Sequence, residues 1–119
     1  NAFMRETYYE APYPKVDEDK KELLISSKTG ICWYRGYFKE DLSQEEVEKP
    51  LKKFKANAIV VGHSLHLRVK KFFDGKVYGI DVKHSSDYHK NWPDFDSEGL
   101  LITNGNYYRA MADGTLEKL

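Results

Sequence analysis

The chain has 119 residues, of which 40% are hydrophobic and 32% charged, and its 19 basic and 19 acidic residues give a formal net charge of zero. This length fits one domain, over residues 1–119, with a modest core. The absence of a basic stripe argues against a nucleic-acid partner, and the absence of an apolar run of about 20 residues argues against a membrane-spanning helix and a membrane partner.

The first part of the chain has little regular pattern. Residues 1–22 are polar, carry two prolines and a charged run, and are expected to form an irregular arm. Two short apolar pieces follow in residues 23–38, separated by a turn of sequence SSKTG. Cys32 is the single cysteine, so no internal disulfide can form. The cellular compartment stays open, with a cytoplasmic location favoured.

The clearest helix signal begins at Ser43. This residue is a good N-cap, and Glu46 lies three positions later, which makes a capping box. Pro50 lacks a backbone donor and should bend or restart the helix near Lys49. One apolar stripe follows at helical spacing: Val47, Leu51 and Phe54.

The residues after this helix predict strands. The run 58–61 is apolar and ends on Gly62, which indicates a buried strand with a sharp exit, and His63 stands at that exit. Residues 67–73 and 76–82 are expected to pair as a hairpin around Asp74-Gly75. A polar loop spans 83–99, and two further strands are expected around Asn104-Gly105. The predicted fold class is α/β of the α+β type, a mostly antiparallel mixed sheet packed on one main helix.

Four histidines are candidates for metal ligands: His63, His66, His84 and His89. In one interpretation all four form a zinc site within the chain. In the other, His63 alone is a ligand and its partners come from elsewhere, because His84 and His89 lie in the polar loop and no cysteine pair supports them.

Arg35, in the stretch WYRGYF, is the other candidate for a site residue. Its planar guanidinium would suit two oxygens of a phosphate group. The alternative is that it stacks on Trp33 or Tyr37 and serves packing only.

Four segments taken in order carry a resemblance: CWYRGYF, IVVGHS, FFDGKVYGIDV and the ending GLLITNGNYYRAMADGTLEKL. Over about residues 30–119, this set resembles the C-terminal third of calcineurin-like metallophosphoesterases, above all the bacterial branch similar to serine/threonine protein phosphatases. The resemblance implies the C-terminal portion of a metallophosphoesterase sandwich. It also implies a hydrolase of phosphate monoesters with two divalent ions (Mn, Fe or Zn), with His63 as a metal ligand and Arg35 contacting the substrate phosphate.

The chain departs from that family at several places. Ser64 stands where threonine is usual, His66 lies one position beyond the second histidine of some members, and Val82 begins a different continuation after the hairpin. The family's other metal-binding motifs are absent and would precede Asn1. The chain is therefore expected to be a C-terminal piece that is inactive alone and holds metal weakly or not at all. The alternative is a small non-enzymatic binding or oligomerisation domain, such as a homodimer paired through exposed strand edges.

Overall fold

A computed structural model describes residues 30, 33–39, 42–82 and 97–119. The chain divides into two units, Asn1–Glu40 and Asp41–Leu119, and each is described by itself. The predicted arm over 1–22, the first apolar piece, Cys32 and most of the polar loop lie outside the described residues. The predicted single domain over 1–119 stays a prediction.

The described part of the first unit is a turn followed by the short helix α3, Gly36–Lys39. The backbone N–H groups of Trp33 and Tyr34 both donate to the carbonyl oxygen of Gly30, at 2.8 and 2.9 Å. The ring of Tyr34 occupies the space that a side chain at Gly36 would need, and it meets Tyr37 edge-on with ring centroids 5.2 Å apart. Glycine at position 36 is therefore required for this aromatic contact.

Helix α4, Gln44–Phe54, begins with the predicted capping box. The Ser43 N–H donates to Glu46 Oε2 at 2.8 Å, and the Glu46 N–H donates to Ser43 Oγ at 3.3 Å. The helix continues through Pro50 and ends at Lys55 in the left-handed conformation, so it does not restart near Lys49, and the alternative, a bend there, stays a prediction. Val47, one turn before the proline, and Leu51, directly after it, are both buried. Packing therefore stabilises the helix on both sides of the proline.

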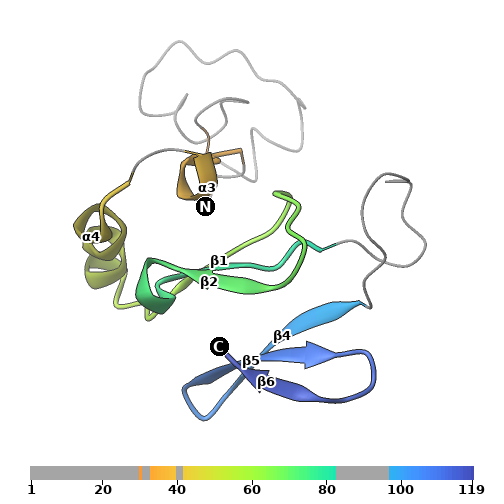
Figure 1. Cartoon of the computed structure of the whole chain (residues 1–119). Helices are drawn as coiled ribbons and strands as arrows, with labels where there is room; N and C mark the ends of the chain where they lie inside the picture. Colours follow the sequence, from red (N-terminus) through yellow and green to blue (C-terminus); the bar gives the residue numbers. More distant parts are fainter. Residues whose placement is uncertain (1–29, 31–32, 40–41, 83–96) are drawn as a thin grey trace, which may run out of the picture. The chain divides into compact units, whose positions relative to one another are not determined.

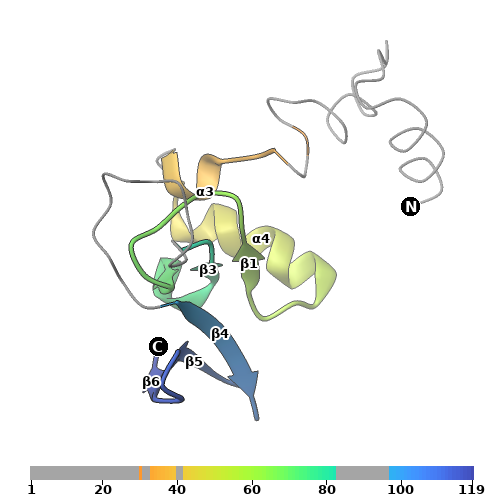
Figure 2. The same cartoon turned by 90° about the vertical axis from the view of Figure 1, so that its right-hand side faces the viewer.

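The first sheet has three short strands: β1 Ile59–Val61, β2 Lys70–Phe72 and β3 Val77–Gly79. Their order is β1-β3-β2, with β1 parallel and β2 antiparallel to β3. The run 58–61, which was predicted to be a buried strand, contains β1 and is only partly buried, since Val60 is 45% exposed. In contrast, Val77 and Tyr78 of β3 are buried. The central strand is the buried one because it has neighbours on both sides. Helix α4 lies beside β1 in both views (Figures 1 and 2).

The predicted hairpin of 67–73 and 76–82 is confirmed as the antiparallel pair β2–β3. Its connection contains the 3-10 turn η1, Phe73–Gly75, rather than a two-residue turn. Three consecutive residues there, Phe73, Asp74 and Gly75, have positive φ values of 50°, 48° and 81°. The side-chain amide of Gln44 donates to the Phe73 carbonyl oxygen at 3.1 Å and so links α4 to this turn.

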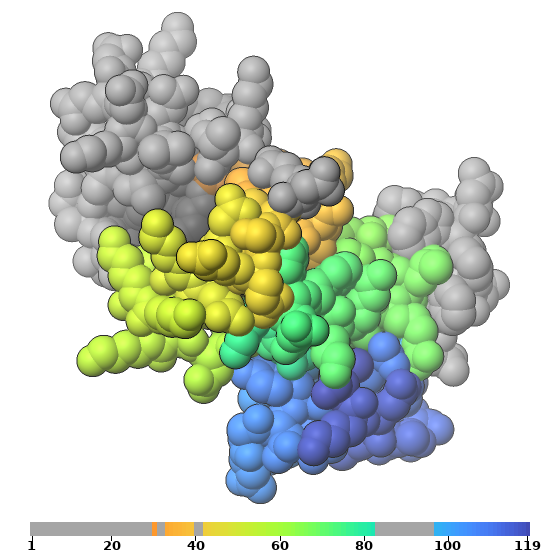
Figure 3. Space-filling view, turned by 60° about the vertical axis from the view of Figure 1, so that its left-hand side comes forward, coloured from red at the N-terminus to blue at the C-terminus, as the bar shows by residue number. Residues whose placement is uncertain are grey.

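The second sheet is an antiparallel meander of β4 Glu98–Thr103, β5 Asn106–Met111 and β6 Leu116–Lys118. The predicted Asn104-Gly105 turn is confirmed, with positive φ at both residues. One face of this sheet meets the first sheet, where Tyr78 and Tyr107 stack with centroids 4.5 Å apart and ring planes 8° apart. Figure 3 shows the blue strands β4–β6 lying against the green segment of β2 and β3.

The mixed α+β class is confirmed, but the single predicted sheet is two three-stranded sheets, and the sandwich of a metallophosphoesterase is not supported. The two sheets meet through their side chains instead of sharing strands, so the local pattern alone could not separate them. The outer strands leave edges that no described strand pairs with, and the predicted homodimer through such edges stays a prediction. None of the described helices is long and apolar enough to cross a membrane.

Candidate functional site

His63 lies two residues after the end of β1, at an exposed bend. Its φ of 65° places a non-glycine residue in the left-handed region, which histidine tolerates better than most residues do. Its imidazole is therefore presented at the surface of the sheet end and not inside the core. The prediction that this residue leaves a strand end is confirmed, while its role as a ligand is untested by the geometry.

Arg35 is half-buried and directly precedes α3. It belongs to the unit Asn1–Glu40, whereas His63 belongs to the unit Asp41–Leu119, and each is described within its own unit. Contact of Arg35 with a phosphate stays a prediction. His84 and His89 lie outside the described residues, so the four-histidine zinc site is also untested.

His66 has a structural position at the end of the first sheet. Its backbone N–H donates to the Asp81 carbonyl oxygen at 2.8 Å, and its ring lies directly over Gly79, where a side chain would overlap it. Its ring centroid is 5.4 Å from that of Phe72. Burial lowers the pKa of the imidazole from its usual 6.5; nearby Lys70 lowers it further and Asp81 opposes the shift. His66 is therefore held in a setting that favours the neutral ring.

A group of charged side chains joins the two sheets, and Glu98 is at its centre. Its side chain is 5% exposed, and three N–H donors lie within 3.2 Å of its carboxylate oxygens. Arg68 Nε donates to Oε1 at 2.7 Å, while the Val69 N–H donates to Oε2 at 2.9 Å. Arg109 Nε lies 3.2 Å from the same Oε2. A carboxylate so deeply buried needs this set of donors to offset its lost hydration.

Arg109 comes from the middle of β5, and its side chain is 9% exposed. Its Nε also donates to the Val69 carbonyl oxygen at 2.8 Å, so it bridges the loop before β2 and the second sheet. Its Nη1 lies 2.6 Å from Glu117 Oε2, and Arg68 Nη2 lies 3.6 Å from that oxygen. Hydrogen bonding to Arg109 lowers the pKa of Glu117, and hydrogen bonding to Glu98 raises the pKa of Arg68.

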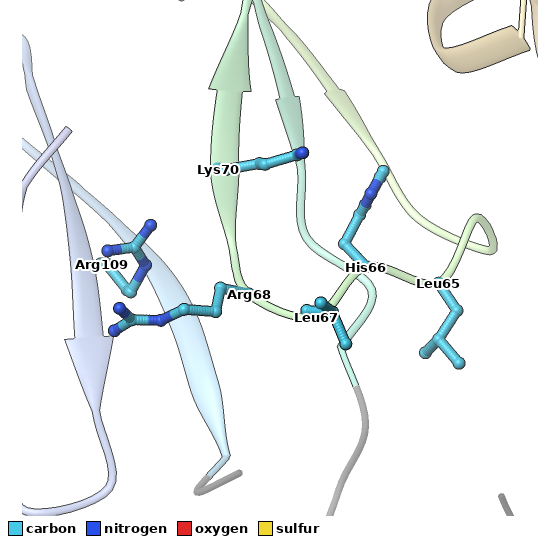
Figure 4. Close-up of a pocket in the computed structure, with 6 residues that line it drawn as sticks. All are labelled: Leu65, His66, Leu67, Arg68, Lys70 and Arg109. Atoms are coloured by element: carbon cyan, nitrogen blue, oxygen red, sulfur yellow. The ribbon is translucent and has the colours of Figure 1, made fainter. Parts of the chain in front are cut away.

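These guanidinium groups border a pocket with a volume of about 440 Å³ (Figure 4). In Figure 4 the side chains of Arg68 and Arg109 lie next to each other, and Lys70 projects from β2. The ammonium group of Lys70 lies 4.8 Å from the centroid of the Phe72 ring. The lining residues are Leu65, His66, Leu67, Arg68, Lys70 and Arg109. The pocket thus combines three basic side chains with an apolar wall.

Sequence reasoning missed this cationic pocket. One signal could have found part of it: Arg109 alternates with Tyr107 and Met111 on one face of a strand, and a charge within such a stripe indicates a buried ion pair. Its partner Glu98 could not be chosen from the sequence, because several other carboxylates are equally near along the chain.

No family model and no curated protein matches this chain. Solved structures do match. One is the cold-active protein-tyrosine phosphatase of a psychrophile, Shewanella sp., at 34% identity over 100% of this chain, with a TM-score of 0.79. The chain is similar to cold-active protein-tyrosine phosphatases. A point mutant of a cold-active protein tyrosine phosphatase, and another structure of such an enzyme at 1.1 Å, each match 86% of the chain at 36% identity, with TM-scores of 0.68.

The chain spans about a third of the length of the phosphatases it matches, 34% in the first case and 28% in the other two. By this comparison the predicted calcineurin-like metallophosphoesterase, with its serine/threonine phosphatase character, is wrong, because the similar structures are named protein-tyrosine phosphatases. The short motifs that carried the prediction, above all Gly-His, were not specific enough to decide between classes of phosphatase. The non-enzymatic binding or oligomerisation domain is not favoured either.

The predicted pair of divalent ions (Mn, Fe or Zn) is corrected by the same comparison, whereas the role of His63 as a ligand stays a prediction. Within 30, 33–39, 42–82 and 97–119, moreover, no group of three or more His, Cys, Asp or Glu side chains could hold a metal ion. A Gly-His pair at a strand end is a local pattern, whereas a metal site needs several ligands brought together by the tertiary fold.

Proposed function

We propose that this chain is part of a phosphatase that hydrolyses phosphate esters of tyrosine in proteins. The observation that carries the proposal is the match to the Shewanella enzyme over the whole chain, at 34% identity and a TM-score of 0.79. The chain corresponds to about a third of that enzyme. The activity is therefore proposed for the protein that contains these 119 residues, with a phosphoester as substrate.

Within that activity, Arg35 is proposed to contact the substrate phosphate. A guanidinium presents paired N–H donors that match two phosphate oxygens, and it keeps its charge at any physiological pH. Arg35 is half-buried, and its carbonyl oxygen accepts a hydrogen bond from the Phe38 N–H at 3.1 Å, which orders the backbone at this position. A fixed donor contributes more to transition-state stabilisation than one that must be ordered during the reaction.

A chimeric enzyme tests the proposal. Residues 1–119 replace the matching third of the Shewanella phosphatase, and circular dichroism establishes that the chimera is folded. Hydrolysis of a phosphotyrosine peptide is then compared with hydrolysis of a phosphoserine peptide of the same sequence. Faster release of phosphate from phosphotyrosine is expected. A folded chimera that leaves the phosphotyrosine peptide intact refutes the proposed function.

The same chimera tests Arg35. Arg35→Ala should lower kcat/KM by roughly 100-fold, because one donor to the transferring phosphoryl group is lost. Arg35→Lys should restore part of the rate, since it keeps the charge but loses the paired donors. Lys39→Ala removes an exposed cation four residues away and should leave the rate unchanged. Equal rates for Arg35→Ala and Lys39→Ala would reject the role of Arg35.

A further inference from the structure

Arg68 and Arg109 together form a clamp that already holds one carboxylate. Glu117 Oε2 lies 2.6 Å from Arg109 Nη1 and 3.6 Å from Arg68 Nη2. On the other side, Glu98 binds the Nε atoms of both arginines, at 2.7 and 3.2 Å. Glu98 therefore fixes the two guanidinium groups in position, with their outer nitrogens directed at a common acceptor. A pair of arginines held in this way is preorganised for an anion.

The two carboxylates of this cluster differ in how easily they can be replaced. The side chain of Glu98 is 5% exposed, whereas that of Glu117 is 52% exposed. Glu117 also belongs to β6, a strand of three exposed residues at the edge of its sheet. Arg109 is 9% exposed and needs a carboxylate partner, but an incoming carboxylate supplies the same contact, and the exposed Glu117 can return to water. A carboxylate from outside can therefore take the place of Glu117 at small cost.

The pocket beside the clamp has the size and charge to receive such a group. Its volume of about 440 Å³ lies within the range of small-ligand sites in proteins. Lys70 adds a third cation, whose ammonium group lies over the ring of Phe72 at 4.8 Å from its centroid. When Glu117 is displaced, the three cations of the pocket face two carboxylates, Glu98 and Asp81, which leaves one excess positive charge for the incoming group. Leu65 and Leu67 provide an apolar wall for the methylene groups of a bound side chain.

We propose that this pocket binds an acidic side chain of a peptide. Its carboxylate displaces Glu117 from between Arg68 and Arg109, and Lys70 attracts it. The proposal rests on the proposed phosphatase function, since the peptide is then part of the protein substrate, and the pocket favours substrates that carry glutamate or aspartate in the segment that reaches it. Glu117 acts as an internal competitor that an acidic substrate replaces and a neutral one does not.

Peptide binding to the 119-residue chain tests the pocket. Two fluorescent peptides are titrated by polarisation at low salt, both with unphosphorylated tyrosine, one flanked by glutamates and the other by the same number of glutamines. The glutamate peptide should bind roughly 5-fold more tightly or better, as a complementary charge in a partly enclosed site would give. Equal dissociation constants for the two peptides would overturn the proposal.

Two substitutions distinguish the pocket from a general charge effect. Lys70→Gln should weaken binding of the glutamate peptide roughly 3- to 5-fold, and Glu117→Gln should strengthen it by a similar factor. Lys70→Arg should keep the affinity. The matched controls are Lys71→Gln, at the next position of β2 and on its opposite face, and Glu45→Gln, in the first turn of α4. Equal effects at Lys70 and Lys71, or no gain from Glu117→Gln, would overturn the assignment.

Failure of this inference can be separated from failure of the proposed phosphatase. Selective binding of the glutamate peptide, together with a folded chimera that does not hydrolyse phosphotyrosine, would retain the pocket and reject the enzyme. Hydrolysis of phosphotyrosine with the same kcat/KM for peptides flanked by glutamate and by glutamine would retain the enzyme and reject the pocket.

Discussion

Glu98→Gln is the substitution that most directly tests the link between the two sheets. Glutamine has nearly the same shape as glutamate, but it has one acceptor oxygen and one amide donor and carries no charge. In the structure, Arg68 Nε donates to one carboxylate oxygen, while the Val69 N–H and Arg109 Nε approach the other. Whichever way the amide is turned, its NH₂ group faces at least one of these donors.

The expected loss of stability follows from which donor is left unsatisfied. The lower-cost arrangement turns the NH₂ group toward Arg68, because this side chain is 43% exposed and water can solvate it, whereas Arg109 is 9% exposed. One hydrogen bond to a charged group is lost, which costs about 1.5–3 kcal/mol, and a partly exposed site lies near the lower end of that range. We therefore expect a decrease of about 2 kcal/mol in the free energy of unfolding, equivalent to about 8 °C in Tm.

Thermal and urea unfolding followed by circular dichroism measure this change. Glu48→Gln is the matched control: this side chain is 28% exposed, pairs with Lys52 and accepts a hydrogen bond from Gln44, and its substitution should move the midpoint much less. If Glu98→Gln unfolds at the same temperature as Glu48→Gln and the unchanged chain, the buried ion cluster does not hold the sheets together, and the reasoning fails.

Three further substitutions test local features by the same unfolding assay. Gly79→Ala should cost about 1–3 kcal/mol, since the new methyl group overlaps the ring of His66, whereas Gly62→Ala, where the space is open, should be neutral or slightly stabilising; equal effects would contradict the packing of that ring. Because the folded pKa of His66 is lowered from 6.5, the unfolded chain binds its proton more readily. This contribution to stability is complete above pH 6.5 and is lost as the pH falls through the folded pKa; His66→Gln should flatten the stability slope between about pH 7 and 5, and an unchanged slope would count against it. Ser43→Ala should cost about 1 kcal/mol and Ser43→Thr much less, while a midpoint unchanged in both would show that the capping box with Glu46 does not stabilise α4.

The sequence by itself determined the features that depend on neighbouring residues. The capping box of Ser43 and Glu46 lies within one helical turn, and the Asn104-Gly105 turn is set by two residues that tolerate positive φ. The pairing of β2 with β3 followed from two apolar segments on either side of a short turn. The general class of mixed helix and sheet followed from the order of these elements. For each of these, the stabilising contact and the residues that make it are close in sequence.

The tertiary structure alone decided how those pieces combine and where a site can form. The tertiary structure decided that the strands form two sheets and that β3 is the buried strand of the first one. It also decided that Glu98 meets Val69 and Arg109. The Glu98–Val69 contact spans 29 residues, and the Arg109–Val69 contact spans 40. A buried carboxylate is stable only where several donors converge, and that convergence depends on how the sheets pack. His63 illustrates the same limit, since its position at a strand end was visible in the sequence, but the set of groups around it is a property of the folded chain.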